Sequence, residues 1–115
     1  MLLEEVMHRK VYTVQSDTSL KDALHLMEKH RIRHLPVTEG DQLVGIVSDR
    51  DLREAGPSSL EKEARNKALE QPVSSIMKRD VITAHPLDFS EDAARIMYEY
   101  RIGCLPVLQE GRIVG

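Results

Sequence analysis

The apolar and polar residues in the first half of the chain change their period twice. Residues 11–14 form a short apolar run of strand type, and a polar break follows them. The next apolar residues have the i, i+3, i+4, i+7 spacing of one helix face: Leu20, Ala23, Leu24 and Met27. Thr18 stands just before this run and is the predicted N-cap. The pattern therefore predicts a strand followed by an amphipathic helix.

A β-hairpin and a further helix are predicted next. Two short apolar runs, 35–37 and 43–47, flank the polar segment 39–42, which contains a glycine. Because proline cannot donate a hydrogen bond to a sheet ladder, Pro36 predicts that the first of these strands lies at a sheet edge. Residues 48–51 then open another helix. One unit thus has the order strand, helix, strand, strand, helix.

The whole pattern recurs after 70 residues without a gap. The identical pairs are Met7 and Met77, Arg9 and Arg79, Val11 and Val81, Thr13 and Thr83, Asp22 and Asp92, Ala23 and Ala93, Met27 and Met97, Arg31 and Arg101, Ile32 and Ile102, Leu35 and Leu105, Pro36 and Pro106, Val37 and Val107, Val44 and Val114, and Gly45 and Gly115. In the second copy residues 81–84 repeat the strand, and Asp88 is the predicted N-cap of the helix that follows. This agreement is far above chance and predicts two structurally similar repeats.

The repeat predicts an α/β (α+β) fold in three parts. Residues 1–55 form the first repeat, 56–72 a connecting helix, and 73–115 the second repeat. The second copy reaches only Gly115, so it lacks the end of its last strand and its final helix. A half-made hairpin would leave backbone groups and apolar surface uncovered, so we expect the natural chain to continue.

The composition excludes several classes of partner. Of the 115 residues 41% are hydrophobic and 30% are charged, and the net charge of −3 offers no basic surface for a nucleic acid. No apolar stretch reaches the length that a membrane-spanning helix needs. The lone Cys104 cannot form an internal disulfide. We therefore expect a cytoplasmic protein without a nucleic-acid or membrane partner.

Ser48 and Asp51, at the junction of a strand and a helix, support two interpretations. The first is a capping box, in which the serine hydroxyl and the aspartate carboxylate satisfy each other's backbone amides. The second is a nucleotide site: a helix N-terminus favours a phosphate, and a neighbouring carboxylate can accept hydrogen bonds from a ribose diol. Arg50 would add a charge-assisted contact to the phosphate. The two interpretations can hold at different moments.

The basic run 30–34 precedes the first strand of the hairpin and is also open to two interpretations. Basic residues at a helix C-terminus are favoured by the helix dipole and are usually solvated. In a strand-helix-strand unit, however, Arg33 and His34 would enter the second strand close to Ser48 and face the same cleft. The second copy has Gly103 and Cys104 at these positions, so we expect only one strong anion site.

Metal binding and catalysis have little support in the sequence. His25, His30 and His34 invite a metal hypothesis, but no carboxylate or cysteine stands at a supporting ligand spacing. Cys104 beside an aliphatic strand is expected to be a small buried hydrophobe. No Ser-His-Asp order with an elbow motif, no P-loop and no dinucleotide fingerprint occurs. These observations favour a binding protein over an enzyme.

The doubled pattern resembles a tandem pair of CBS domains, the Bateman module. The resemblance rests on RHLPV and GCLPV, on GIVSDRD in the first copy, and on the 70-residue period. It implies two pseudo-symmetric halves with ligand clefts between them, a homodimer formed through the CBS helices, and binding of AMP, ADP, ATP or S-adenosylmethionine. The stretches AHPLDFSED and YRIGCLPV are also similar to the CBS portion of acetoin utilisation proteins of the AcuB type, in which a C-terminal ACT-type domain follows.

The resemblance also implies site residues. By position Ser48 and Asp51 would hold the ribose, Arg33 and His34 would contact phosphate, and the pocket would be lined by Thr13, Ile32, Pro36 and Ile46. The matching positions of the second copy are Thr83, Ile102, Gly103, Cys104 and Pro106. The second Ser/Thr-x-x-Asp motif would fall beyond Gly115.

These observations predict a non-catalytic regulatory module. It would bind an adenine nucleotide or adenosyl ligand in the cleft between the repeats and signal to an attached domain or partner, with acetoin utilisation as the implied process. The first alternative is a ligand-free structural dimerisation module that uses the apolar helix faces. The second is a hydrolase that uses Asp51 or His34, against which the missing nucleophile and base count.

Overall fold

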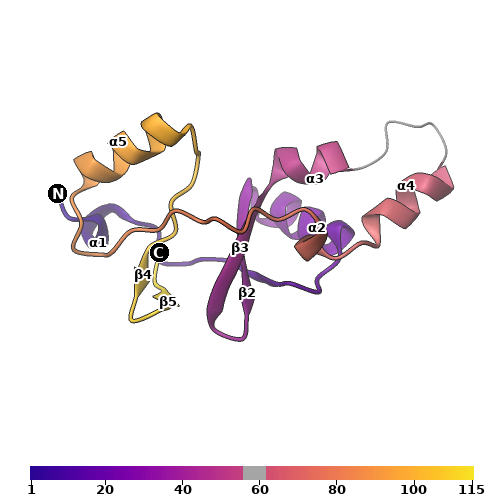
Figure 1. Ribbon diagram of the computed structural model, residues 1–115, viewed down its shortest axis with the longest axis horizontal. Coiled ribbons are helices and arrows are strands. Elements are labelled where there is room, and N and C mark those ends of the chain that lie inside the picture. Colours follow the sequence, from indigo (N-terminus) through magenta and orange to yellow (C-terminus); the bar gives the residue numbers. More distant parts are fainter. Residues whose placement is uncertain (56–61) are drawn as a thin grey trace. The chain divides into compact units, whose positions relative to one another are not determined.

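The computed structural model describes residues 1–55 and 62–115 and has a mixed α/β fold (Figure 1). Its helices are α1 (Leu3–Val6), α2 (Leu20–His30), α3 (Asp49–Ala55), α4 (Lys62–Leu69), the 3-10 helix η1 (Val73–Ser75) and α5 (Ser90–Tyr100). Its strands are β1 (Val14–Gln15), β2 (His34–Glu39), β3 (Gln42–Ser48), β4 (Leu108–Gln109) and β5 (Arg112–Ile113). The fold class, the helices α2 and α5 and the hairpin formed by β2 and β3 are confirmed. The predicted first strands are shorter than expected: 11–14 is reduced to β1, and 81–84 forms only the isolated bridge between Ala84 and Val107.

The described chain divides into two compact units, each assembled from separate stretches of sequence. The Ser48 unit consists of Thr13–Gly40 and Val44–Val81. The Cys104 unit consists of Met1–Tyr12, Asp41–Leu43 and Ile82–Gly115. The sequence repeat and the compact units are therefore different divisions of the chain, because the segment that leads each repeat belongs to the unit of the other.

In the Ser48 unit the segment around residue 72 attaches to the start of α2. The Val73 amide donates to the Thr18 carbonyl at 2.8 Å, and the Leu20 amide donates to the Gln71 carbonyl at 2.9 Å. Ser19 and Pro72 form the bridge between these bonds. A segment from the second half of the sequence thus forms backbone hydrogen bonds with the start of the helix α2 in the first half.

The Cys104 unit repeats this arrangement with its partners exchanged. The Leu3 amide donates to the Asp88 carbonyl at 2.8 Å, and the Ser90 amide donates to the Met1 carbonyl at 2.7 Å. α1 contacts α5 in this unit. Each bond matches one in the Ser48 unit at a spacing of 70 residues, so the repeat is preserved in backbone geometry as well as in sequence.

The prediction that Pro36 marks a sheet edge is wrong, because β2 is the central strand in the order β1-β2-β3. β1 is parallel to β2 and only two residues long. The matching pair in the Cys104 unit shows the reason: the Ala84 amide donates to the Pro106 carbonyl, and the Leu108 amide donates to the Ala84 carbonyl. This ladder uses the carbonyl of the proline and an amide two residues later, so the missing N–H costs no ladder bond.

The predicted helix caps are also wrong. The N-cap of α2 is Ser19, whose hydroxyl accepts from the Asp22 amide at 3.1 Å. Thr18 bonds through its backbone instead: its amide donates to the Gln15 carbonyl and its carbonyl accepts from the Val73 amide. Before α5 the Asp88 carboxylate accepts from the His85 amide at 2.8 Å and closes a turn. Thr18 and Asp88 each precede the true N-cap by one residue, and Ser19 and Phe89 occupy the cap positions.

The core of the Ser48 unit contains the helix face predicted from the sequence. Leu20, Ala23 and Met27 are buried, whereas Leu24 is half-buried. Its buried apolar side chains are Val14, Leu20, Ala23, Met27, Leu35, Val37, Val47, Leu52, Val73 and Met77. α2 and α3 lie side by side (Figure 1). In the Cys104 unit the smaller core is formed by Leu3, Ala93 and Val107, with Met7, Ala84, Leu105 and Val114 packed against it.

Within the predicted connecting segment 56–72 the structure has α4, which contacts α2. Residues 56–61 lie outside the described part of the chain. None of the described helices is long and apolar enough to cross a membrane.

Gly45 is required by the close approach of Met77, which is buried. A Cβ at position 45 would lie 2.5 Å from the Met77 Sδ and 3.1 Å from the Lys78 carbonyl oxygen. Substitution Gly45→Ala is therefore expected to destabilise the protein by about 1–3 kcal/mol, since overpacking forces side chains or backbone to shift. Urea unfolding would measure this cost.

A double-mutant cycle with Met77→Ala provides the control. If the clash with the methionine is the cause, Gly45→Ala costs less free energy in the Met77→Ala background than in the wild type. Equal costs in the two backgrounds would contradict the assigned contact.

Candidate functional site

Ser48 ends β3, and its side chain caps the helix that follows. The Asp51 amide donates to the Ser48 Oγ at 3.1 Å, which is one half of the predicted capping box. Within the described residues the Asp51 carboxylate makes no hydrogen bond or ion pair, so the reciprocal half is absent. Asp51 is half-buried. A carboxylate with unused acceptor capacity therefore stands on the opening turn of α3.

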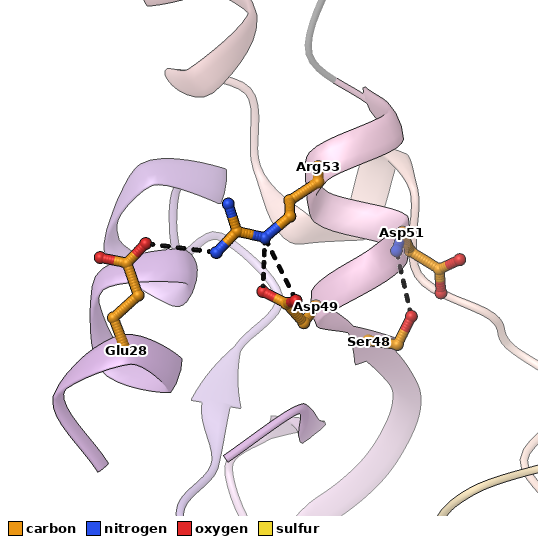
Figure 2. Close-up of polar contacts among 5 residues, drawn as sticks. All are labelled: Glu28, Ser48, Asp49, Asp51 and Arg53. Atoms are coloured by element: carbon orange, nitrogen blue, oxygen red, sulfur yellow. Dashed lines mark hydrogen bonds and ion pairs between the residues drawn. The ribbon is translucent and has the colours of Figure 1, made fainter. Parts of the chain in front are cut away.

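A separate ion-pair cluster holds the same turn from the other side (Figure 2). The Arg53 Nε donates to the two Asp49 carboxylate oxygens at 3.0 and 3.2 Å, and its Nη2 lies 3.5 Å from the Glu28 Oε1. Glu28 belongs to α2, so the cluster joins α2 to α3. Figure 2 shows Ser48 and Asp51 on the side of α3 away from this cluster. Asp51 thus remains available for a ligand.

The Arg33–His34 pair is brought to the start of α3 by a backbone hydrogen bond. The Asp49 amide donates to the Arg33 carbonyl at 2.7 Å, and His34 is the first residue of β2. Arg33 is exposed and His34 is half-buried. The Arg33 backbone is thus held beside Asp49, the first residue of α3.

The His34 imidazole responds to three charges around it. Burial lowers its pKa below the ordinary value of 6.5, because a half-buried imidazolium loses part of its hydration. Asp51 acts in the opposite direction and raises the pKa, while Lys78 and Arg33 lower it further. The net direction is downward, so the neutral imidazole is favoured near neutral pH.

Lys78 is a member of this group that the sequence analysis missed. The Ile46 amide donates to the Lys78 carbonyl at 3.0 Å, and the Lys78 amide donates to the Ile46 carbonyl at 3.0 Å. This reciprocal pair fixes the Lys78 backbone beside β3, at Ile46, which is two residues before Ser48. The sequence offers no local signal for this contact, because the 70-residue period assigns Ile46 to the first repeat and Lys78 to the second.

The structure places the remaining predicted residues of the Ser48 unit in different environments. Thr13 is exposed and precedes β1, whereas Pro36 is buried in β2. Ile32 and Ile46 are half-buried. Arg50 is largely exposed, and its Nε donates to the Glu54 carboxylate at 3.0 Å. Arg50 is therefore engaged on the helix surface rather than with Asp51.

The matching positions in the Cys104 unit carry fewer charges. Thr83 and Gly103 are exposed, Pro106 is buried, and Ile102 and Cys104 are half-buried. Burial raises the pKa of the Cys104 thiol, because the thiolate would lose hydration. A neutral thiol thus stands where the Ser48 unit has an imidazole.

The described residues contain no group of three or more His, Cys, Asp or Glu side chains that could hold a metal ion. His25 lies exposed on α2, and His30 is the last residue of that helix. The structure thus adds nothing to the histidine-based metal hypothesis.

Both copies of the sequence pattern match a known protein family. The CBS domain model covers residues 3–58 and 73–115, in two stretches. The chain belongs to the CBS domain family. As a tandem CBS-domain chain it is similar to a candidate acetoin utilization protein (AcuB) from Vibrio cholerae: 36% identity, a TM-score of 0.86, and coverage of 100% of this chain and 82% of that one.

Two further solved CBS structures contain ligands. The CBS domain pair of protein MJ0100, in complex with 5-methylthioadenosine and S-adenosyl-L-methionine, is 32% identical with a TM-score of 0.83, over 100% of this chain and 86% of that chain. CBSX2, in complex with AMP, is 28% identical with a TM-score of 0.82, over 99% and 87%. The predicted family and fold are confirmed.

The lowered pKa of His34 predicts a pH dependence of stability. Below the ordinary value of 6.5 the unfolded chain takes up a proton on this residue more readily than the folded chain does, so acidification favours unfolding. The stabilising contribution is present above pH 6.5 and is lost as the pH falls through the lower pKa of the folded state. His34→Gln lacks this titration.

Urea unfolding of the wild type and of His34→Gln between about pH 5 and pH 8 would isolate the effect. The wild type is expected to lose more stability on acidification than the variant. His25→Gln, on the exposed surface of α2, is the matched control and should follow the wild type. Parallel curves for the wild type and His34→Gln would refute the assignment.

Proposed function

We propose that this CBS-domain chain is a non-catalytic regulatory module that binds an adenine nucleotide or adenosyl ligand at Ser48 and Asp51 and signals to an attached domain or partner. The observation that carries the proposal is the Asp51 carboxylate on the first turn of α3, which pairs with no residue in the described part of the chain and acts on the His34 imidazole. A carboxylate can accept hydrogen bonds from both hydroxyls of a ribose. The half-buried Ile32 and Ile46 offer apolar side chains for an adenine ring.

The ligand-bound relatives support the adenosyl class. AMP, 5-methylthioadenosine and S-adenosyl-L-methionine, which are bound in the related structures, share an adenosine group and differ beyond it. The shared group is the part that an aspartate and two isoleucines would recognise. The proposed ligand residues are Thr13, Ile32, Arg33, His34, Pro36, Ile46, Ser48, Arg50 and Asp51, with Thr83, Ile102, Gly103, Cys104 and Pro106 in the Cys104 unit.

The side chains favour binding over reaction. The Ser48 hydroxyl accepts from the Asp51 amide and serves as a cap, and the Cys104 thiol is held neutral by burial. A hydrolytic nucleophile needs an adjacent base or a lowered pKa. Neither of these two groups shows such activation, so we assign no catalytic role to them.

Signalling would follow from a shift between conformations. A ligand that contacts the start of α3 and the 33–34 segment stabilises the arrangement in which these are held together. The size of the shift is limited to the difference between the ligand's affinities for the two arrangements. The similarity to the Vibrio cholerae protein favours acetoin utilisation as the regulated process.

A ligand-free dimerisation module is the second candidate, and the surface of α5 favours it. Tyr98 and Tyr100 are 85% and 62% exposed, which leaves two large aromatic side chains uncovered within the described residues. Aromatic side chains are enriched at protein interfaces. In this case the CBS helices would join two copies, and the Asp51 carboxylate would have no ligand.

Thermal denaturation with AMP, ADP, ATP and S-adenosylmethionine tests the first candidate. A ligand at about 100 times its Kd stabilises the folded state by about 3 kcal/mol, and at least one of the four should produce such a shift. Asp51→Ala is expected to abolish it, because the ribose loses its acceptor.

Asp49→Asn is the matched control, since it changes the same helix turn on the side away from Asp51. It should retain the ligand-induced shift. Melting that no ligand alters, together with a concentration-dependent dimer in sedimentation analysis, would instead favour the dimerisation module.

A further inference from the structure

We propose that Lys78 is a specificity-determining residue, which together with Arg33 and His34 makes the Ser48 unit select phosphorylated adenosine ligands over adenosine and S-adenosylmethionine. This inference rests on the proposed function, because it names the ligand class of the same site. It concerns a residue that the second half of the sequence contributes to a unit formed mostly by the first half.

The backbone of Lys78 is held firmly although its side chain is exposed. Both of its main-chain groups bond to Ile46 at 3.0 Å, and its neighbour Met77 is buried against Gly45. Val73, four residues before Met77, is completely buried. The Lys78 backbone is therefore fixed beside β3, and its exposed side chain can extend toward a ligand.

Lys78, Arg33 and Asp51 lie close enough to act on one imidazole. Each of the three changes the pKa of His34, Asp51 upward and the two cations downward. Arg33 is tied to the start of α3 by the Asp49 amide, independently of Lys78. Three separate segments thus come together around the His34 imidazole, beside the start of α3.

Two permanent cations, Lys78 and Arg33, and one carboxylate, Asp51, act on the His34 imidazole, which leaves a surplus of positive charge there. Within the described residues neither Lys78 nor Arg33 has an ion pair, whereas Arg50 and Arg53 are engaged with carboxylates on the α3 surface. A phosphate attached to the bound ribose would meet this surplus through charge-assisted hydrogen bonds. The sulfonium of S-adenosylmethionine is itself positive and would be repelled by these cations.

The Cys104 unit has the same backbone arrangement without these cations. A Cβ on Gly115 would lie 2.5 Å from the Met7 Sδ and 3.1 Å from the His8 carbonyl oxygen, the same distances that Gly45 has to Met77 and Lys78. His8 is therefore the structural counterpart of Lys78. Since Gly103 and Cys104 replace Arg33 and His34, the selection for phosphate belongs to the Ser48 unit.

Calorimetric titration of the protein with adenosine, AMP, ATP and S-adenosylmethionine tests the proposal. The wild type should bind AMP and ATP more tightly than adenosine. Lys78→Gln should weaken AMP and ATP binding about 10-fold, as expected for the loss of one charge-assisted hydrogen bond, and leave adenosine binding within about 2-fold of the wild type. Added salt should weaken ATP binding less in the variant than in the wild type.

Two variants separate charge from structure. Lys21→Gln removes one positive charge from the exposed surface of α2 and should bind all four ligands like the wild type. Lys78→Arg keeps the charge and should retain the preference for phosphate. If Lys78→Gln fails to fold, Arg33→Gln removes the other permanent cation and is expected to give the same selective loss.

The outcomes distinguish this proposal from the one it rests on. Equal wild-type affinities for adenosine and AMP, or an equal loss of both in Lys78→Gln, would overturn the charge selection and leave adenosyl binding intact. A loss of phosphate preference in Lys78→Arg as large as in Lys78→Gln would overturn it as well. Failure of every ligand to bind would overturn both proposals.

Discussion

The reciprocal backbone pair between Ile46 and Lys78 is the interaction on which the Ser48 unit depends. It joins a segment of the second sequence repeat to the hairpin of the first, with both N–H···O distances at 3.0 Å. Such a contact costs loop-closure entropy, which the buried Val73 and Met77 must offset. A glycine at position 45 allows Met77 to approach. Gly45 thus allows the 71–78 segment to contact both the start of α2 and the strand β3, which also fixes the backbone of Lys78.

The site itself is held by weaker contacts than the core behind it. Asp49 is bound to the Arg33 carbonyl, and Ser48 caps the turn through its hydroxyl. The Glu28–Arg53–Asp49 cluster is exposed at Glu28 and Arg53 and half-buried at Asp49, and such surface pairs contribute about 1 kcal/mol or less each. Elements with low local stability are those that a ligand can reposition. The opening turn of α3 is therefore better suited to respond to occupancy than the buried sheet is.

The sequence pattern predicted the helices α2 and α5 and the β2–β3 hairpin, but not the helix caps, the extent of the first strands or the assembly of the elements. Period and spacing identified the repeat, the buried face of α2 and the hairpin, since these depend on neighbours close along the chain. The proline rule failed at Pro36 because the short parallel ladder with β1 begins at Val37, and its counterpart in the other unit uses the proline carbonyl and an amide two residues later. Lys78 was missed because a contact between repeats leaves no local pattern. Ser48 and Asp51 were identified, but only the structure shows that the Asp51 carboxylate pairs with none of the described residues.

The exchange of leading segments also gives the proposed signal a physical route. A phosphorylated ligand held by Asp51 and Lys78 would bridge α3 to the segment that ends the Ser48 unit at Val81. Ile82 follows directly and belongs to the Cys104 unit, so the two units are joined covalently just beyond the ligand's anchor. A ligand contact that shifts Lys78 would thus act on a segment that continues directly into the Cys104 unit, without requiring a side-chain pathway. A ligand bound through Asp51 alone would lack this connection, so the phosphate contact, rather than adenosine recognition, would carry the signal.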